Sequence, residues 1–183
     1  AEALAGEMFG HLQARPEIAE LAANPMLLTA MCIIYQEGKR LPQDKYDLYD
    51  RITDTVLCNR YPNDPTQVDL VRNRLCVVAY GMHTGYGLGE QRATPQAEAT
   101  HDEIDRLIKR YRDDSPGTER EFQGAVQVRE DLLTRSGILL PREGDRAAFY
   151  HLTFQDFLAA QRLLDLEGER LLEALRERAE HPE

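Results

Sequence analysis

Four glycines, Gly81, Gly85, Gly87 and Gly89, lie close together near the middle of the chain. Glycine-rich loops can cradle phosphate groups, because their backbone N–H groups approach an anion where no side chain intervenes. A phosphate-binding loop of this kind also needs a buried strand before it and a Gly-Lys-Ser/Thr sequence after it, and this stretch has neither. The spacing therefore favours a flexible connector between two helical segments.

The five histidines are candidates for chemistry as metal ligands or general bases. They are scattered without the spacing of a metal site, and the sequence has no HExxH motif and no nucleophile elbow. A stand-alone enzyme is therefore the least favoured of three interpretations, and no metal site is expected. The histidines are His11, His83, His101, His151 and His181.

The cysteines Cys32, Cys58 and Cys76 are far apart and form no CxxC pattern. Each lies in an apolar helical stretch, so we expect reduced, buried thiols in a cytoplasmic protein. No apolar run approaches the roughly 20 residues of a membrane helix. We therefore expect no membrane partner.

The composition is that of an ordinary globular protein, with 42% hydrophobic and 30% charged residues in 183. This length allows one or two domains. The formal net charge is −10, from 22 basic and 32 acidic residues. Such a charge works against a nucleic-acid partner, because affinity for nucleic acid depends on neutralising phosphates.

Helical periodicity covers most of the first half of the chain. Asn24 is a suitable N-cap and Pro25 a suitable first helical residue. The stretch 26–35 that follows is apolar on all sides, so we expect burial on most of its faces. The spacing of apolar residues predicts two further helices, one from about Asp44 to about Arg60 and one from an Asp64 cap to about Met82.

The second half of the chain changes period. A capping box at Thr118 predicts a helix that ends near Arg135. Two short apolar runs, 138–141 and 147–152, flank turn residues and predict a β-hairpin. Thr153 and Asp156 suggest another capping box, directly behind the hairpin. The predicted fold class is therefore mainly α: a small helical bundle followed by a winged-helix domain with one short β-hairpin.

Two segments resemble one known family. Residues 21–32 (LAANPMLLTAMC), continued by LP at 41–42 and LYDR at 48–51, resemble the NPLLLT helix and downstream motif of NACHT NTPases. Residues 133–139 (LTRSGIL) and 149–160 (FYHLTFQDFLAA) resemble the winged-helix block of the same family. The two blocks stand in the family's order. The resemblance covers residues 16–165.

The family consists of signal-transducing P-loop ATPases and includes the NOD-like receptors and bacterial NACHT proteins. The resemblance implies a NACHT-associated helical domain at 1–85, a connector at 86–99, a winged-helix domain at 100–165 and the start of a following helical segment at 166–183. The chain has no GxxxxGK[ST] motif. We therefore expect a non-catalytic fragment, with an ATPase domain that precedes Ala1 in the parent protein. ATP or ADP would bind the full-length protein, and none is expected to bind tightly to the fragment.

The resemblance assigns nucleotide contacts to two residues of this chain. Pro25 matches the proline that packs on adenine, and His151 matches the histidine that reaches the β-phosphate of ADP in the closed state. For Pro25 the alternative is simple helix capping, which is compatible with adenine contact. For His151 the alternative is a hydrogen bond to the local backbone. Asp156 departs from the family, which usually has Glu there.

Two functions remain in competition. The first is a regulatory lid that contacts ADP and ATP and switches between a closed ADP-bound state and an open, self-associating state. Its partner is the upstream nucleotide-binding domain, and the family implies roles in innate immunity or antiphage defence. The alternative is a winged-helix DNA-binding regulator. The acidic chain and the mixed charges of the predicted helix that ends near Arg135 disfavour it, so we expect no nucleic-acid partner.

Overall fold

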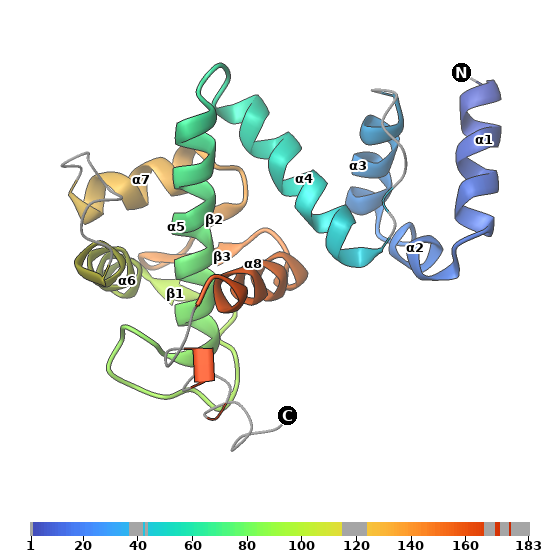
Figure 1. The fold of residues 1–183 in the computed structure, drawn as a ribbon. Coiled ribbons are helices and arrows are strands. Elements are labelled where there is room, and N and C mark those ends of the chain that lie inside the picture. The colour runs from blue at the N-terminus through green and yellow to red at the C-terminus, as the bar shows by residue number, and fades with distance from the viewer. Residues whose placement is uncertain are drawn as a thin grey trace. The chain divides into compact units, whose positions relative to one another are not determined.

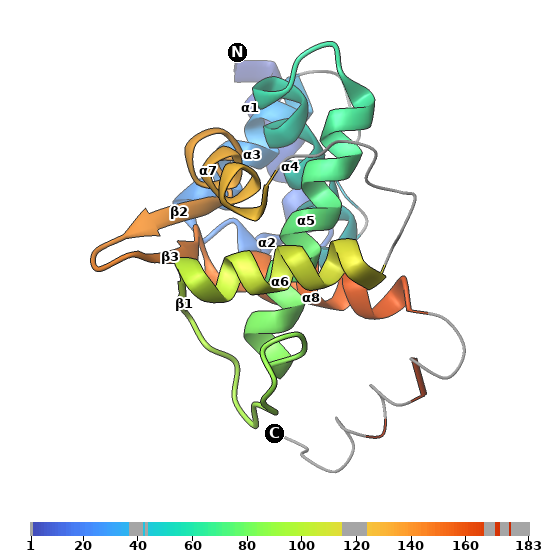
Figure 2. The ribbon, with the colours of Figure 1, turned by 90° about the vertical axis from the view of Figure 1, so that its left-hand side faces the viewer.

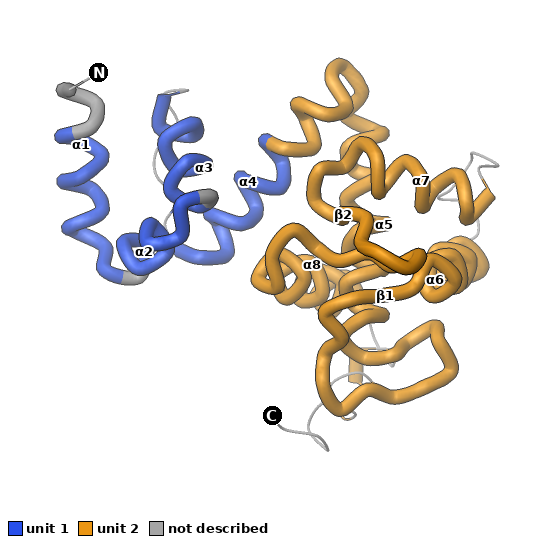
Figure 3. The backbone as a smooth tube through the Cα atoms, turned by 180° about the vertical axis from the view of Figure 1, so that it is seen from behind, with its two compact units in different colours: residues 1–55 blue, residues 56–183 orange. Residues whose placement is uncertain are grey.

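The computed structural model describes residues 2–36, 42, 44–114, 124–166, 171–172 and 176. The chain divides into two compact units, residues 1–55 and residues 56–183 (Figure 3). The boundary falls within the helix α4. The domain boundaries expected from the sequence stay a prediction.

The first unit consists of helices. In chain order they are α1 (Glu2–Gln13), α2 (Pro16–Leu21), α3 (Pro25–Gln36) and the first part of α4 (Lys45–Arg60). Asn24 Oδ1 accepts a hydrogen bond from Leu27 N at 3.4 Å, and Pro25 is the first residue of α3. Asp44 Oδ1 accepts from Asp47 N at 2.8 Å in front of α4. The predicted starts of both helices are confirmed.

Among the described side chains of α3, the buried ones lie on one face. Leu27, Met31 and Ile34 are at most 3% exposed, and their spacing of four and three residues places them on one side of the helix. Leu28 is 37% exposed and Ile33 is 42% exposed. The expectation that most faces of this helix are buried is therefore wrong. A unit this small has too few helices to surround one of its members.

The cysteines also depart from expectation. Cys32 and Cys58 are exposed, and only Cys76 is buried. An apolar helical stretch places a cysteine on a helix but does not decide which face it occupies. At Cys76, burial raises the pKa of the thiol to about 12. This thiol is therefore unreactive at neutral pH.

The second unit has winged-helix topology (Figures 1 and 2). Helices come first along the chain, a β-hairpin follows them, and one more helix follows the hairpin. The sheet order is β1-β3-β2 and all pairs are antiparallel. The predicted hairpin and mainly α fold are confirmed, whereas the two-residue strand β1 was not predicted. The elements are α5 (Pro65–Thr84), β1 (Ala99–Thr100), α6 (His101–Asp114), α7 (Ala125–Arg135), β2 (Leu139–Arg142), β3 (Arg146–Phe149) and α8 (Leu152–Leu164).

The helix α5 is the central element of this unit and packs against α8 and α6. Asp64 Oδ1 accepts from Gln67 N at 3.0 Å, which confirms the predicted cap. A Cβ on Gly81 would collide with the side chain of Leu107 on α6, so the glycine permits close approach of the two helices. For α7, the predicted Thr118 capping box lies outside the described residues, and the predicted end at Arg135 is confirmed.

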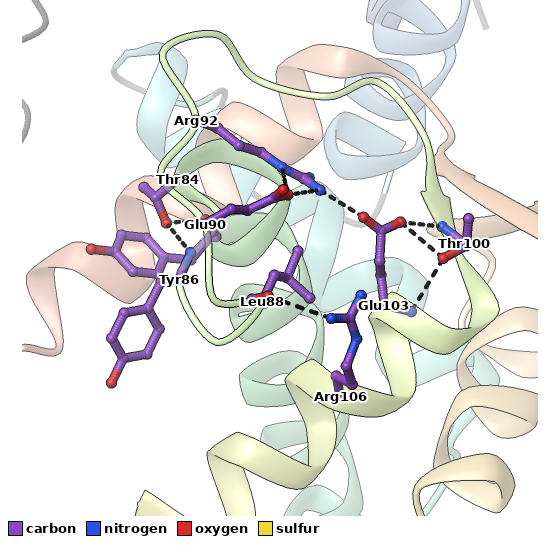
Figure 4. A network of polar contacts seen from close by, with 9 residues as sticks. Thr84, Tyr86, Leu88, Glu90, Arg92, Thr100, Glu103 and Arg106 are labelled. Carbon is purple, nitrogen blue, oxygen red and sulfur yellow. Dashed lines mark hydrogen bonds and ion pairs between the residues drawn. The ribbon is translucent and has the colours of Figure 1, made fainter.

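The glycine-rich segment is tied to the helices on both sides of it (Figure 4). Arg92 N donates to Thr84 O at 3.0 Å, and the Arg92 guanidinium contacts Glu103 on α6 at 2.6 Å. Arg106 donates to Leu88 O at 3.4 Å. The glycine pattern that suggested a flexible connector did not predict these contacts.

Candidate functional site

The start of α8 presents His151 directly behind the β-hairpin. Tyr150 N donates to Ile138 O at 2.8 Å, which fixes the chain as it leaves the hairpin. His151 then has extended backbone angles, φ −147° and ψ 144°, and α8 begins at Leu152. The exposed imidazole therefore lies at the N-terminus of a 13-residue helix.

The side chain of His151 is the N-cap of α8. Its Nδ1 accepts from Thr153 N at 3.3 Å and lies 2.9 Å from Thr153 Oγ1. Thr153 is thus the second residue of the helix, and the predicted capping box of Thr153 and Asp156 is wrong. The extended backbone of His151 brings its own ring over the first turn, so the imidazole takes the place of the expected hydroxyl.

This hydrogen bond leaves Nε2 as the ring nitrogen of His151 that can act as a donor. A backbone N–H points at Nδ1, so Nδ1 carries its lone pair and the proton of the neutral ring is on Nε2. The Nε2–H group is therefore available to an acceptor. The positive end of the α8 dipole favours an anion at the same place.

Two apolar side chains flank the histidine in sequence and face solvent. Tyr150, between β3 and α8, is 50% exposed, and Leu152, the first residue of α8, is 55% exposed. By contrast, Phe154, Phe157 and Leu158 on the other side of α8 are buried. The α8 N-terminus thus combines a hydrogen-bond donor with exposed apolar surface.

Polar contacts anchor the first turns of α8. Asp156 Oδ1 lies 2.9 Å from His83 Nε2, on the last turn of α5. Gln155 is fully buried, and its Nε2 donates to Gln96 O at 2.9 Å. The sequence interpretation missed both contacts, because it assigned Asp156 to a local cap and these partners lie 59 and 73 residues away.

Pro25 lies in the first unit, as the first residue of α3, and is exposed. Its carbonyl oxygen accepts from Thr29 Oγ1 at 2.8 Å, one turn along the helix. The place of Pro25 as the first residue of α3 shows the helix-starting role, and the exposed ring remains accessible. His151 lies in the second unit.

Both arginines of α7 are paired with carboxylates. Arg129 contacts Asp105 of α6, and Arg135 Nη1 lies 3.3 Å from Asp131 Oδ1. Burial raises the pKa of Asp105 above its ordinary value, although the Arg129 charge opposes this shift. The helix that precedes the hairpin therefore presents no basic stripe among its described residues.

A family model described as "Winged helix-turn-helix domain C-terminal to NACHT" matches residues 34–163. No curated protein matches the sequence. The match spans α4 to α8 and so includes the hairpin and His151.

Neither a membrane-spanning helix nor a cluster of metal ligands is present among the described residues. No helix among them is both long and apolar enough to cross a membrane. Within the same ranges, no three His, Cys, Asp or Glu side chains gather as a metal ion would require.

Proposed function

The chain belongs to the family of winged helix-turn-helix domains C-terminal to NACHT, and we propose that it acts as the regulatory lid of a NACHT ATPase. A domain of this family is not itself catalytic. Its role is to contact the nucleotide that the upstream nucleotide-binding domain holds. The observation that carries this proposal is the exposed His151 that caps α8 through Nδ1 and so leaves its Nε2 able to donate.

His151 has the properties that a phosphate contact requires. Nδ1 is engaged by Thr153 N, so the ring is held in one tautomer and Nε2–H is a preformed donor. Hydrogen bonds to a charged acceptor contribute about 1.5–3 kcal/mol. We propose that this donor contacts the β-phosphate of ADP and stabilises the closed state.

Pro25 is proposed to contact the adenine from the helical part of the chain. Its exposed ring offers a rigid apolar surface without an amide donor that would have to be satisfied against the base. Its place at the start of α3 fixes the direction of that surface. Adenine contact and helix capping are compatible in one residue.

Switching follows from the difference between the two nucleotide states. A ligand shifts a conformational equilibrium only through its different affinities for the two states. In the proposed cycle, ADP favours the closed form through His151, and ATP favours an open form that self-associates. The cytoplasmic setting and a role in innate immunity or antiphage defence belong to this proposal.

The paired arginines of α7 support a regulatory role over DNA binding. A winged helix that reads DNA needs unpaired cations to neutralise phosphates. Here Arg129 and Arg135 face carboxylates of the same unit, and the chain carries a net charge of −10. We therefore propose no nucleic-acid partner.

The test is the release of N-methylanthraniloyl-ADP from the protein that contains this chain together with its NACHT domain. His151→Ala should release the nucleotide roughly 10- to 100-fold faster, because about 1.5–3 kcal/mol of hydrogen bonding is lost. His11→Ala, on α1 of the first unit, removes another exposed histidine and should leave the rate unchanged. Unchanged release in His151→Ala would contradict the proposed contact.

A further inference from the structure

We infer that His83 and Asp156 form a positioning pair that sets the phosphate-facing donor of His151 by fixing the first turns of α8. The inference rests on the proposed function and extends it to two residues outside the nucleotide contact. Neither residue needs to contact ADP. Both act through the placement of α8.

The pair joins two elements that already pack together. His83 Nε2 and Asp156 Oδ1 are 2.9 Å apart, and the His83 side chain is only 16% exposed, whereas that of Asp156 is 61% exposed. His83 lies in the last turn of α5. Its contact with Asp156 therefore ties the C-terminal end of α5 to the N-terminal half of α8.

The neighbouring residue adds a second tie in the same turn of α8. Gln155 is fully buried and donates to Gln96 O at 2.9 Å. Gln155 and Asp156 follow His151 by four and five residues, so they lie about one helical turn behind it. Together they fix both the axial position and the rotation of the turn that carries His151.

The pair also affects the charge that a phosphate would meet. Asp156 lies about 7.5 Å along the helix axis from His151, at 1.5 Å per residue. That separation is within a Debye length of about 8–10 Å, so an uncompensated carboxylate would repel a phosphate at His151. The His83 ring, with Nε2 2.9 Å from Asp156 Oδ1, engages this carboxylate and limits its repulsion. The pair thus acts on the same site through both geometry and electrostatics.

The experiment measures release of N-methylanthraniloyl-ADP from the protein that contains this chain and its NACHT domain. Asp156→Asn should release the nucleotide about three- to tenfold faster, a range typical of coupled neighbouring groups. Asp156→Glu should restore a nearly normal rate, because it keeps the charge. Glu130→Gln removes one exposed carboxylate from α7, away from α8, and should keep the normal rate.

A charge swap and a double variant separate positioning from general stability. His83→Asp combined with Asp156→His should recover retention that each single change loses, because the pair is rebuilt in reverse. If Asp156→Asn does not fold, the swapped variant tests the inference instead. Recovered retention of the nucleotide supports the inference, and continued fast release of the nucleotide overturns it. His151→Ala with Asp156→Asn should be no faster than His151→Ala alone, because the pair acts through His151.

The outcomes distinguish the two claims. Faster release in His151→Ala with normal release in Asp156→Asn would overturn the positioning role and leave the proposed function standing. Additive acceleration in the double variant would show that the pair does not act through His151, and it would overturn the inference as well. Unchanged release in His151→Ala would contradict the proposed function itself and the inference that rests on it.

Discussion

The helix α3 begins at Pro25 and the helix α8 is capped by His151, the two residues proposed to contact the nucleotide, but the surroundings of the two helices differ. α8 buries Phe154, Phe157 and Leu158 against its own unit and is tied to α5 by Asp156. α3 buries one stripe and leaves Leu28 and Ile33 more than a third exposed. Two helices that are both rich in apolar residues are therefore covered to different extents. In the second unit α8 is packed and held in place, whereas in the first unit α3 is covered on one face.

The largest effect expected from this difference concerns leucines on the two helices. Leu158→Ala should lower the free energy of unfolding by about 2–5 kcal/mol, because Leu158 is fully buried and its loss leaves a cavity. Leu28→Ala should cost less than about 1 kcal/mol, because Leu28 is 37% exposed. Urea unfolding measures the free energy of unfolding of both variants. Equal losses of free energy would contradict the difference in burial between the two helices.

Two adjacent isoleucines repeat the comparison within α3. Ile34 is 1% exposed and Ile33 is 42% exposed. Ile34→Ala should lower the free energy of unfolding by about 2–4 kcal/mol, and Ile33→Ala by less than about 1 kcal/mol. Urea unfolding followed by circular dichroism checks the pair. A larger loss at Ile33 would show that the outer face of α3 is covered.

Two helical glycines should respond with opposite signs. Gly81→Ala should destabilise the second unit by about 1–3 kcal/mol, because the added Cβ collides with Leu107. Gly10→Ala in α1 meets no heavy atom within 4 Å and should stabilise the first unit by about 0.5–1 kcal/mol through helix propensity. Thermal unfolding gives both signs, and a stabilised Gly81→Ala would contradict the close α5–α6 packing.

The smallest effect is a pH dependence at the start of α6. Burial alone would raise the pKa of Glu103, but the Thr100 N–H, the Thr100 hydroxyl and Arg92 outweigh it and hold the pKa below its ordinary value. A carboxyl group with a lowered folded-state pKa stabilises the fold above its unfolded pKa, and this contribution disappears as the pH falls through the folded pKa. Glu103→Gln should therefore lose stability at pH 7 and converge with the wild type at acid pH. Parallel curves from pH 7 to pH 3 would contradict this.

Local signals in the sequence were sufficient for many elements. The Asp64 cap of α5, the Asn24–Pro25 start of α3 and the β-hairpin follow from residue types within a few positions, and all are present. The strand β1 was missed because it has two residues and pairs with β3, 48 positions away at Ala99 and Ala147. A two-residue strand leaves no period to detect.

The candidate site shows the same limit. The motif around His151 indicated the residue, but it did not indicate that the imidazole itself caps α8 or that Asp156 pairs with His83. The first depends on the extended backbone of one residue, and the second depends on how α5 packs against α8. Sequence patterns report local preferences, and the geometry that turns His151 outward arises from packing across the second unit.

The most direct test of the lid proposal is the ratio of ADP to ATP affinity in the protein that contains this chain and its NACHT domain. Equilibrium titration of His151→Ala should show roughly 10- to 100-fold weaker ADP binding with nearly unchanged ATP binding, because His151 is proposed to act only in the ADP-bound closed state. Equal weakening for both nucleotides, or no change for ADP, would contradict a state-specific contact between His151 and the nucleotide.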